Sequence, residues 1–401
     1  MPNPVILRRS IVALLLMSGA TPAIAQWTVS RLQPVTASES HAFGVSGVQQ
    51  VGRAALPVGV HAALWTGSAA SFVDLHPAGA SVGMPSFAFA VSGGQQVGQV
   101  RVGAGDHASL WTGTAASWID LNPTGAGDSI AYGVGDGQQV GTAVLDGSSR
   151  ASLWTGTAAS WVELTPITGA EYSVAFAASG GQQVGYAHVK GGDHASLWSG
   201  TAASWVDLNP AGTSLSQAYG VQGGQQVGVV LLGGQWHAAL WNGTAASFQD
   251  LHPVGASYSE ARGVSRGRQV GYAVVAGVDH ACLWVGTSAS FVDLNSFLPP
   301  EIVWARADGV WDDGVLTHVV GTGYNAVAGH YEALSWTGSA CYANCDGSTV
   351  APLLTANDFF CFLFKFSQGD GYTNCDGSTV APVLTANDFQ CFLNAFSQRC
   401  P

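Results

Sequence analysis

Short runs of residues in which apolar side chains alternate with polar or small ones recur along most of the chain. Residues 86–123 are representative: alternating runs at 86–91, 95–100, 107–111 and 117–122 are separated by glycine-containing turns. Pro123 ends the last run, since a proline nitrogen has no hydrogen to give to a neighbouring strand. A side-chain period of two between such boundaries is typical of strands joined by hairpins. The segment therefore predicts four short antiparallel strands.

The same four-run segment occurs seven times. Each copy carries a tryptophan at the end of its third run, and these tryptophans follow one another every 43 to 52 residues: Trp65, Trp111, Trp154, Trp198, Trp241, Trp284 and Trp336. A period of about 40–45 residues with four strands per copy is typical of a β-propeller blade. The pattern predicts an all-β fold, a seven-bladed propeller over residues 26–340.

The two ends of the repeat array complement each other. The seventh copy has three runs, ends at Gly338 and lacks the fourth, whereas residues 29–34 near the start match the fourth run at 205–210. We therefore expect the first strand to complete the last blade. Such closure removes the exposed sheet edge that an open array would leave.

Composition and the first residues bear on location. Only 9% of residues are charged and the net charge is −12, which argues against a nucleic-acid partner. Residues 1–25 combine Arg8 and Arg9 with an apolar run at 11–17 and a small-residue site at 23–25, the pattern of a secretory signal. That run is too short to span a bilayer comfortably, and no other segment suggests a membrane span. We expect a protein that is secreted or held at the cell surface.

The repeats resemble the HAF family of extracellular repeats. The triplets that carry the resemblance are His61-Ala-Ala, His107-Ala-Ser, His194-Ala-Ser, His237-Ala-Ala and His280-Ala-Cys, with Arg150 in place of histidine in the third copy. The resemblance covers about residues 27–340 and implies an extracellular repeat protein without a known activity.

A polar residue opens the third run of every repeat, and an acid occurs in the fourth run of the first six. The first set is His61, His107, Arg150, His194, His237, His280 and His330; the second is Asp74, Asp120, Glu163, Asp207, Asp250 and Asp293. A metal ring is conceivable, but metal ligands must converge on one point and these positions spread around a ring. We expect each pair to tie neighbouring strands within a blade.

Function is expected where the repeats differ. At the start of the first run, and just before it, variable side chains would lie near the central channel on one face of a propeller. We regard the following as a possible ligand face: His41, Asp128, Glu171, Gln217, Glu260, Trp304, Arg306, Asp308 and Trp311. Aromatic and acidic side chains together suit a glycan, although ordinary loop variation would give the same differences. No G-x-S-x-G, H-E-x-x-H or P-loop motif is present, so we assign no catalytic residue.

Residues 341–401 contain a second, tighter repeat, in which 344–358 returns as 374–388 and each copy continues into an apolar stretch expected to be a short helix. Oxygen-bearing residues at alternate positions are typical of a calcium loop. The expected calcium ligands are Asn344, Asp346, Ser348, Val350 (carbonyl) and Asp358, and Asn374, Asp376, Ser378, Val380 (carbonyl) and Asp388. Each loop would span 15 residues rather than 12, and its glycine stands at the fourth position rather than the sixth. The runs Thr355–Asp358 and Thr385–Asp388 also fit a helix capping box, and both interpretations remain open.

Six of the seven cysteines lie in this module, which in an exported chain indicates disulfides. Repeat symmetry suggests Cys345–Cys361 and Cys375–Cys391, with Cys341 and Cys400 clasping the ends. Cys282, inside a repeat, is expected to be a buried free thiol.

The doublet resembles the cysteine-containing dockerin modules of exported bacterial proteins, on its two Asn-Cys-Asp-Gly-Ser-Thr runs and two Asn-Asp-Phe-x-Cys-Phe-Leu runs. The resemblance implies a helix pair that binds calcium and docks onto a partner such as a cohesin-like receptor.

The sequence thus predicts a non-catalytic binding or scaffold protein tethered through residues 341–401. The alternatives are a polysaccharide-binding or polysaccharide-degrading component of an extracellular assembly, and a purely structural surface protein.

Overall fold

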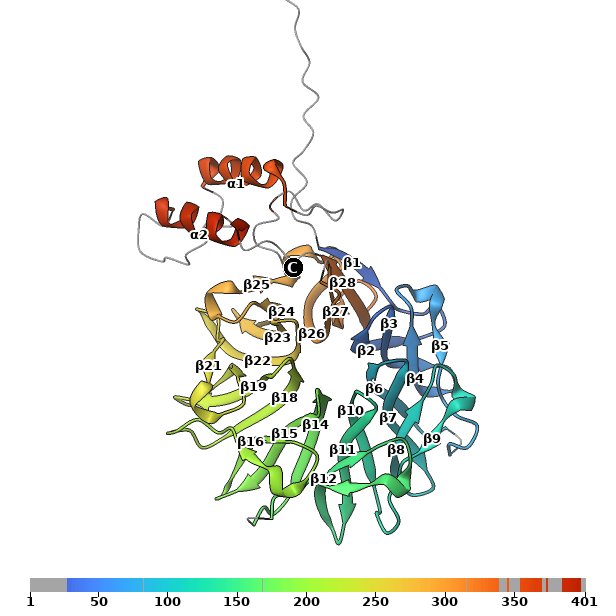
Figure 1. Cartoon of the computed structure of the whole chain (residues 1–401). Coiled ribbons are helices and arrows are strands. Elements are labelled where there is room, and N and C mark those ends of the chain that lie inside the picture. Colours follow the sequence, from blue (N-terminus) through green and yellow to red (C-terminus); the bar gives the residue numbers. More distant parts are fainter. Residues whose placement is uncertain are drawn as a thin grey trace, which may run out of the picture.

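Seven four-stranded antiparallel sheets are arranged around a central channel in the computed structural model of the chain (Figure 1). The structure describes residues 27–81, 83–167, 169–314, 316–338, 345, 354–369, 373 and 384–397. The predicted seven-bladed propeller is confirmed. The proposed signal at residues 1–25 lies outside the described residues.

The blades share one strand order, from the channel outward. The innermost strands are β2 (Glu39–Ser46), β6 (Ser86–Ser92), β10 (Ser129–Gly135), β14 (Ser173–Ser179), β18 (Ser216–Gln222), β22 (Ala256–Ser265) and β26 (Ile302–Asp312). The second strands are β3 (Gln49–Leu56), β7 (Gln95–Val102), β11 (Gln138–Leu145), β15 (Gln182–Val189), β19 (Gln225–Leu232), β23 (Arg268–Val275) and β27 (Thr317–Asn325). The third strands are β4 (Gly59–Trp65), β8 (Gly105–Trp111), β12 (Ser148–Trp154), β16 (Gly192–Trp198), β20 (Gln235–Trp241), β24 (Val278–Trp284) and β28 (His330–Gly338).

The outermost strands are shorter than predicted. They are β1 (Thr28–Arg31), β5 (Val73–Asp74), β9 (Ile119–Asp120), β13 (Val162–Glu163), β17 (Val206–Asp207), β21 (Gln249–Asp250) and β25 (Val292–Asp293). Within the described residues, each of the six two-residue strands follows a short 3-10 helix: η1 (Ala69–Ser71), η2 (Ala115–Ser117), η3 (Ala158–Ser160), η4 (Ala202–Ser204), η5 (Ala245–Ser247) and η6 (Ser288–Ser290); η7 (Leu294–Phe297) follows β25.

The second blade shows why the fourth strand is short. The Ser117 hydroxyl donates to the Thr114 carbonyl at 2.6 Å and accepts from the Thr112 amide at 2.8 Å. These local bonds close a turn where the sequence predicted strand 117–122, since serine and threonine side chains compete with ladder bonding.

The N-terminal strand closes the ring, as predicted. β1 pairs with β28 in antiparallel register, from Thr28 opposite Thr337 to Arg31 opposite Leu334. Arg31 then donates from Nε and Nη2 to the two oxygens of the buried Glu332 carboxylate, each at 2.5 Å. An ion pair between the two ends of the repeat array thus reinforces the strand pairing.

The hydrophobic core lies between neighbouring blades. The seven repeated tryptophans are fully buried, and Trp241 packs with residues of the preceding blade such as Val184 and Leu197. Leu32, Trp65, Val320 and Ala333 form the equivalent cluster across the closure. Because each blade buries its apolar face only against its neighbours, closure completes the core as well as the sheet.

The paired glutamines of the repeat link blades through hydrogen bonds. Gln96 donates from Nε2 to the Gln49 side chain of the preceding blade at 3.2 Å, and its Oε1 accepts from the Gly113 amide at 2.6 Å. Gln139, Gln183, Gln226 and Gln269 repeat both contacts. The repeated polar motif is therefore part of the scaffold.

The repeated histidine and acid form the expected ties within blades. Five histidine Nδ1 atoms lie 2.7–2.9 Å from an aspartate Oδ2: His61–Asp74, His107–Asp120, His194–Asp207, His237–Asp250 and His280–Asp293. In the third blade Arg150 donates to Glu163 at 2.9 Å, so both partners are longer there.

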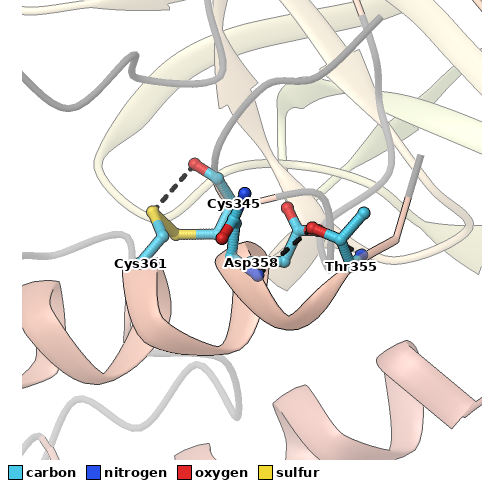
Figure 2. The surroundings of a disulfide bond; sticks show 5 residues. Cys345, Thr355, Asp358 and Cys361 are labelled. Atoms are coloured by element: carbon cyan, nitrogen blue, oxygen red, sulfur yellow. Dashed lines mark hydrogen bonds between the residues drawn. A yellow bond between two sulfur atoms is a disulfide. The ribbon is translucent and has the colours of Figure 1, made fainter. Parts of the chain in front are cut away.

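Two helices follow the propeller in sequence, α1 (Ala356–Gln368) and α2 (Ala386–Ser397). The equivalent residues Phe362 and Phe392 stack with ring centroids 4.1 Å apart and are fully buried. The predicted disulfide Cys345–Cys361 is confirmed (Figure 2). Cys391 is also disulfide-bonded, whereas Cys341, Cys375 and Cys400 lie outside the described residues.

The part of the chain that the structure describes contains no helix with both the length and the apolar character needed to cross a bilayer. Cys282 is buried and free, as predicted, and burial raises the pKa of its thiol.

Candidate functional site: the mouth of the central channel

In each innermost strand, one residue lies at a β-bulge, where the register with the second strand shifts. The register between the first and second strands shifts between Ala42 and Gly44 in the first blade, and at the same place in the other six. Such a bulge leaves one residue unpaired and re-aims its side chain. The seven bulge residues are Phe43, Phe89, Tyr132, Phe176, Tyr219, Arg262 and Asp308, and all of them line the channel.

The glycine of the repeated Gln-Gln-Val-Gly motif makes this arrangement possible. A Cβ atom at Gly98 of β7 would lie 1.8 Å from the carbonyl oxygen of Phe87 on the facing strand β6. The backbone of the bulged strand therefore approaches so closely that only glycine fits opposite it. The motif thereby fixes which residue of β6 faces the channel.

Five of the seven bulge residues form a continuous aromatic arc. Successive ring centroids from Phe43 through Phe89, Tyr132 and Phe176 to Tyr219 are 5.3–5.8 Å apart. Each ring is turned against the next by 39–61°, close to the one-seventh turn that relates successive blades. Flat rings lying across the channel would stay parallel under that rotation, so these rings stand along the channel wall and leave it open.

In the last two blades the bulge residues are charged, and they complete the ring that the aromatic arc begins. Arg262 donates from Nε to Glu260 and from Nη1 to Asp308, while the Tyr258 hydroxyl donates to the other oxygen of Glu260. The side chains of Glu260 and Asp308 are more than nine-tenths buried. With its two acids and one guanidinium, this group has an excess of one negative charge when both acids are ionised.

Burial and mutual contact shift the pKa values of this group. Burial raises the pKa of Asp308 above its ordinary value even though Arg262 acts in the opposite direction. Burial by itself would lower the pKa of Arg262, but the neighbouring carboxylates outweigh it and raise that pKa. Burial, with Glu260 nearby, also raises the pKa of the Tyr258 and Tyr219 phenols. The two phenols therefore stay protonated hydrogen-bond donors at neutral pH.

The bulge residues surround a cavity of about 310 Å³ at one end of the channel, lined also by Glu260. This volume is at the small end of the range for ligand pockets. We refer to this cavity as the channel mouth. All seven bulge residues line this cavity, so their side chains border space that a ligand could occupy.

The structure brings most of the predicted ligand face to the channel mouth or its rim. Glu260 and Asp308 line the cavity itself, and Gln217 accepts the hydroxyl hydrogen of Tyr219 at 2.7 Å. His41 lies 6.1 Å from the Phe43 ring, centroid to centroid. Burial, assisted by Arg53, lowers the pKa of His41 to about 4.

Arg306 and Trp304 belong to the same rim. The Arg306 guanidinium lies 4.3 Å from the centre of the Tyr272 ring and pairs with Asp279 at 2.7 Å. Trp304 packs against Tyr331 at 5.7 Å between centroids, and Tyr331 in turn lies 5.3 Å from His41.

Three predicted residues lie elsewhere. Trp311 is near the end of β26, toward the opposite end of the channel, with its ring 5.3 Å from that of His318. Asp128 accepts from the Asp106 amide at 2.8 Å and so ties the segment before β10 to β8. The Glu171 amide donates to the His188 carbonyl of β15, and the Glu171 carbonyl accepts from the Ser148 hydroxyl of β12, while the residue is exposed.

Sequence reasoning missed the bulge residues other than Asp308. It compared the position two residues earlier in each repeat, where His41, Gln217, Glu260 and Arg306 stand. The missed position carries a clear signal: it is aromatic in five consecutive repeats and charged only in the last two.

The predicted calcium residues are described only in part. Asp358 and Asp388 are buried and accept from the backbone amides of Thr355 and Thr385 at 2.7 Å, which are the contacts of a capping box. Figure 2 shows the first of the two, between Thr355 and Asp358. The other eight, Asn344, Asp346, Ser348, Val350, Asn374, Asp376, Ser378 and Val380, lie outside the described residues. Among the residues that the structure does describe, no three metal-ligating side chains gather.

Comparisons with known proteins add similarity of fold. A scan against protein-family models and a search of curated proteins each gave no match. Among solved structures, the chain is similar to a puromycin hydrolase complex (TM-score 0.49, 12% identity, 77% of this chain and 55% of that one). It thus spans about half the length of that protein. It is also similar to the β-propeller domain of the trilobed protease from Pyrococcus furiosus (0.44, 8%, 75% and 94%). A third similar structure is an oligogalacturonate lyase in complex with manganese (0.44, 11%, 78% and 97%). Likenesses at this level carry no argument about what this chain does.

Proposed function

We propose that this chain is an exported, non-catalytic binding protein whose propeller takes a ligand at the channel mouth. One observation carries the proposal. Seven structurally equivalent bulge residues, one per blade, all line the channel mouth, yet they differ in chemistry between blades one to five and blades six and seven. The glutamine, tryptophan and histidine positions that hold the ring together vary far less. The wall of the channel mouth is therefore aromatic on one side and charged on the other. Such a wall suits a ligand that has one apolar and one polar side.

The hydrogen bonding of Glu260 supports a role in positioning Arg262 rather than in proton transfer. Both oxygens of Glu260 accept hydrogen bonds, from Arg262 and from Tyr258. A general base needs an oxygen within reach of the proton that it removes. Glu260 is thus engaged in holding Arg262, and that guanidinium is held ready for a ligand.

The full-length chain should be screened by ligand-observed NMR against a mixed panel of oligosaccharides, nucleosides, amino acids, aromatic acids and organic amines, with product analysis of every sample. We expect at least one class to bind without turnover, and Phe89→Leu to weaken that binding. Product formation would favour the polysaccharide-degrading alternative. If no ligand responds to the Phe89 substitution, the channel mouth is not the binding site and the proposal fails.

Export and tethering complete the proposed role. Export is supported by the signal-like pattern of residues 1–25, by the HAF-like repeats and by the disulfide Cys345–Cys361. Tethering through residues 341–401 is supported by the dockerin-like doublet and by the surface of α1. Phe360 and Phe364 of α1 are 66% and 56% exposed, while the equivalent residues of α2 are the polar Gln390 and Asn394. The near-identical repeats thus differ where α1 could meet a cohesin-like partner.

Calcium binding by the module is tested by calorimetric titration of the chelator-treated, oxidised chain. We expect two saturable sites, each lost on changing its own loop residue, Asp346→Ala or Asp376→Ala. Ser367→Ala, which removes a hydrogen bond to the Phe364 carbonyl at 2.7 Å and touches no proposed ligand, is the matched control and should leave both sites. A chain that takes up no calcium would have a helix pair held by capping boxes and disulfides alone, and calcium-dependent docking would be excluded.

A further inference from the structure

The channel mouth has two chemically distinct sides. On the side of blades one to five, the aromatic arc from Phe43 to Tyr219 presents mainly carbon and hydrogen to the cavity. The Tyr132 hydroxyl is a polar group on this side, and no hydrogen bond engages it within the described residues. On the side of blades six and seven stand Arg262 and Asp308. A ligand that fills the cavity must therefore offer one apolar surface and one polar edge.

On the polar side of the channel mouth, one hydrogen-bond donor and one acceptor are not engaged by other described residues. Arg262 uses Nε and Nη1 on Glu260 and Asp308, and Asp308 uses only Oδ1. Within the described residues, no bond engages Arg262 Nη2 or Asp308 Oδ2. Both groups are held in place by their mutual bond and by Glu260, so little side-chain freedom is lost when a ligand binds. A fixed donor beside a fixed acceptor matches a ligand edge that both donates and accepts.

The charge balance of the channel mouth further restricts the class of ligand. The group Glu260, Arg262 and Asp308 carries two acids against one guanidinium. On the rim, Arg306 is paired with Asp279, and Arg53 lies 3.6 Å from Glu39. No unpaired cation among the described residues of the mouth compensates the extra carboxylate. An anionic ligand would thus be desolvated beside an excess of negative charge, which is unfavourable.

We infer that the channel mouth binds an uncharged sugar ring. The face of the ring that presents C–H groups packs against the aromatic arc, and two neighbouring hydroxyls of the ring bond to Arg262 Nη2 and Asp308 Oδ2. This inference rests on the proposed function and names its ligand class. Each hydroxyl can donate and accept, so a hydroxyl pair satisfies both free groups at once. A uronate ring offers the same shape with a negative charge and is discriminated against.

The test is calorimetric titration of the full-length chain with neutral tetrasaccharides of β-1,4-glucan, β-1,3-glucan, β-1,4-xylan and β-1,4-mannan. The best glucan or mannan ligand is then compared with its form oxidised to the carboxylate at C6. Three variants are measured: Phe89→Leu keeps the apolar volume without the ring, Arg262→Met removes the donor, and Phe248→Leu is the control. Phe248→Leu makes the same change as Phe89→Leu, but directly before β21, the outermost strand of the fifth blade. Thermal denaturation reports whether each variant is folded.

We expect Phe89→Leu and Arg262→Met each to weaken binding about tenfold, the loss typical of a central binding contact. Phe248→Leu should leave the affinity within about twofold, and oxidation at C6 should weaken binding. Equal or tighter binding of the oxidised sugar would overturn the inference. So would sugar binding that survives both channel variants. If no saccharide binds while another class in the NMR panel responds to Phe89→Leu, this inference fails and the proposed function stands. If Arg262→Met proves unfolded, Phe89→Leu and its control Phe248→Leu still decide.

Discussion

Gly141, the last residue of the Gln-Gln-Val-Gly motif in the third repeat, shows how one position controls the site. A Cβ atom there would lie 1.8 Å from the carbonyl oxygen of Ile130 and 2.9 Å from the Cα of Ala131, so the two strands would have to separate. The bulge at Tyr132 depends on that close approach. The glycine is therefore needed for strand packing, and through the packing it sets the direction of a channel-lining ring.

This dependence gives a prediction with a matched control in the same blade. Gly141→Ala should destabilise the fold by about 3 kcal/mol, because the added carbon meets backbone rather than a movable side chain. Gly127→Ala, where a Cβ meets nothing within 4 Å, should change stability by less than about 0.5 kcal/mol. Urea denaturation followed by tryptophan fluorescence measures both. Equal effects would show that the bulge does not require glycine.

His41 on the rim has its own prediction, since burial, and to a lesser extent Arg53, lowers its pKa from the ordinary 6.5 to about 4. The folded chain therefore holds this proton less tightly than the unfolded chain. The corresponding stability is complete above pH 6.5 and is lost as the pH falls from there toward 4. NMR titration of the His41 ring should give a midpoint near 4, and Arg53→Gln should raise it only partly because burial remains. A midpoint near 6.5 in the native chain would contradict this environment.

Among the elements, the side-chain pair that links the third and fourth strands of a blade occurs in a short and a long form. Five blades use histidine with aspartate, and the third uses the longer Arg150 with the longer Glu163, at 2.9 Å. Both partners lie in the same strands in every case. The tie thus depends on the combined reach of two side chains rather than on either residue type alone.

A double-mutant cycle on the third blade tests this compensation. Arg150→His or Glu163→Asp by itself should weaken the tie, while the double substitution recreates the pair of the other blades. We expect a coupling of about 0.5–1 kcal/mol, because both side chains are about one-third exposed and water screens the pair. Thermal denaturation of the four proteins measures it, and strictly additive losses would mean that the pair contributes nothing as a unit.

The whole ring depends on one junction. β1 and β28 join sequence segments about 300 residues apart, and Arg31 there pairs with the buried Glu332. Burial alone would raise the pKa of Glu332, but bonds from Arg31 and Asn325 outweigh it and lower that pKa below its ordinary value of 4.5. This carboxylate therefore contributes stability above pH 4.5 that is lost as the pH falls through its lower folded value.

We predict that Arg31→Met destabilises the propeller by about 1–2 kcal/mol at neutral pH. Loss of a buried pair would cost more, but the Arg31 side chain is 43% exposed and partly screened. The variant should also lose less stability on acidification, since Glu332 no longer gains from ionisation. Arg101→Met, which breaks a partly exposed pair with Asp106 at 3.3 Å, is the control and should cost less than about 1 kcal/mol. Urea denaturation at pH 7 and pH 4 decides; equal losses for the two variants would show that the junction has no special role.

The sequence by itself determined the architecture, because the strand pattern of one blade recurs about every 45 residues. The number of blades, the completion of the last one by residues 29–34, the histidine–aspartate ties and the Cys345–Cys361 bond all follow from comparing copies. The extent of the fourth strand did not, since local serine bonds override the alternating pattern there.

Only the tertiary structure decided the candidate site. A bulge changes which side chain an innermost strand turns toward the channel, and it results from contact with the glycine of a neighbouring strand rather than from the strand's own pattern. The five aromatic rings, Arg262 and Asp308 come from seven segments spread over more than 260 residues. Their shared cavity exists only because the ring closes and brings the first blade against the last.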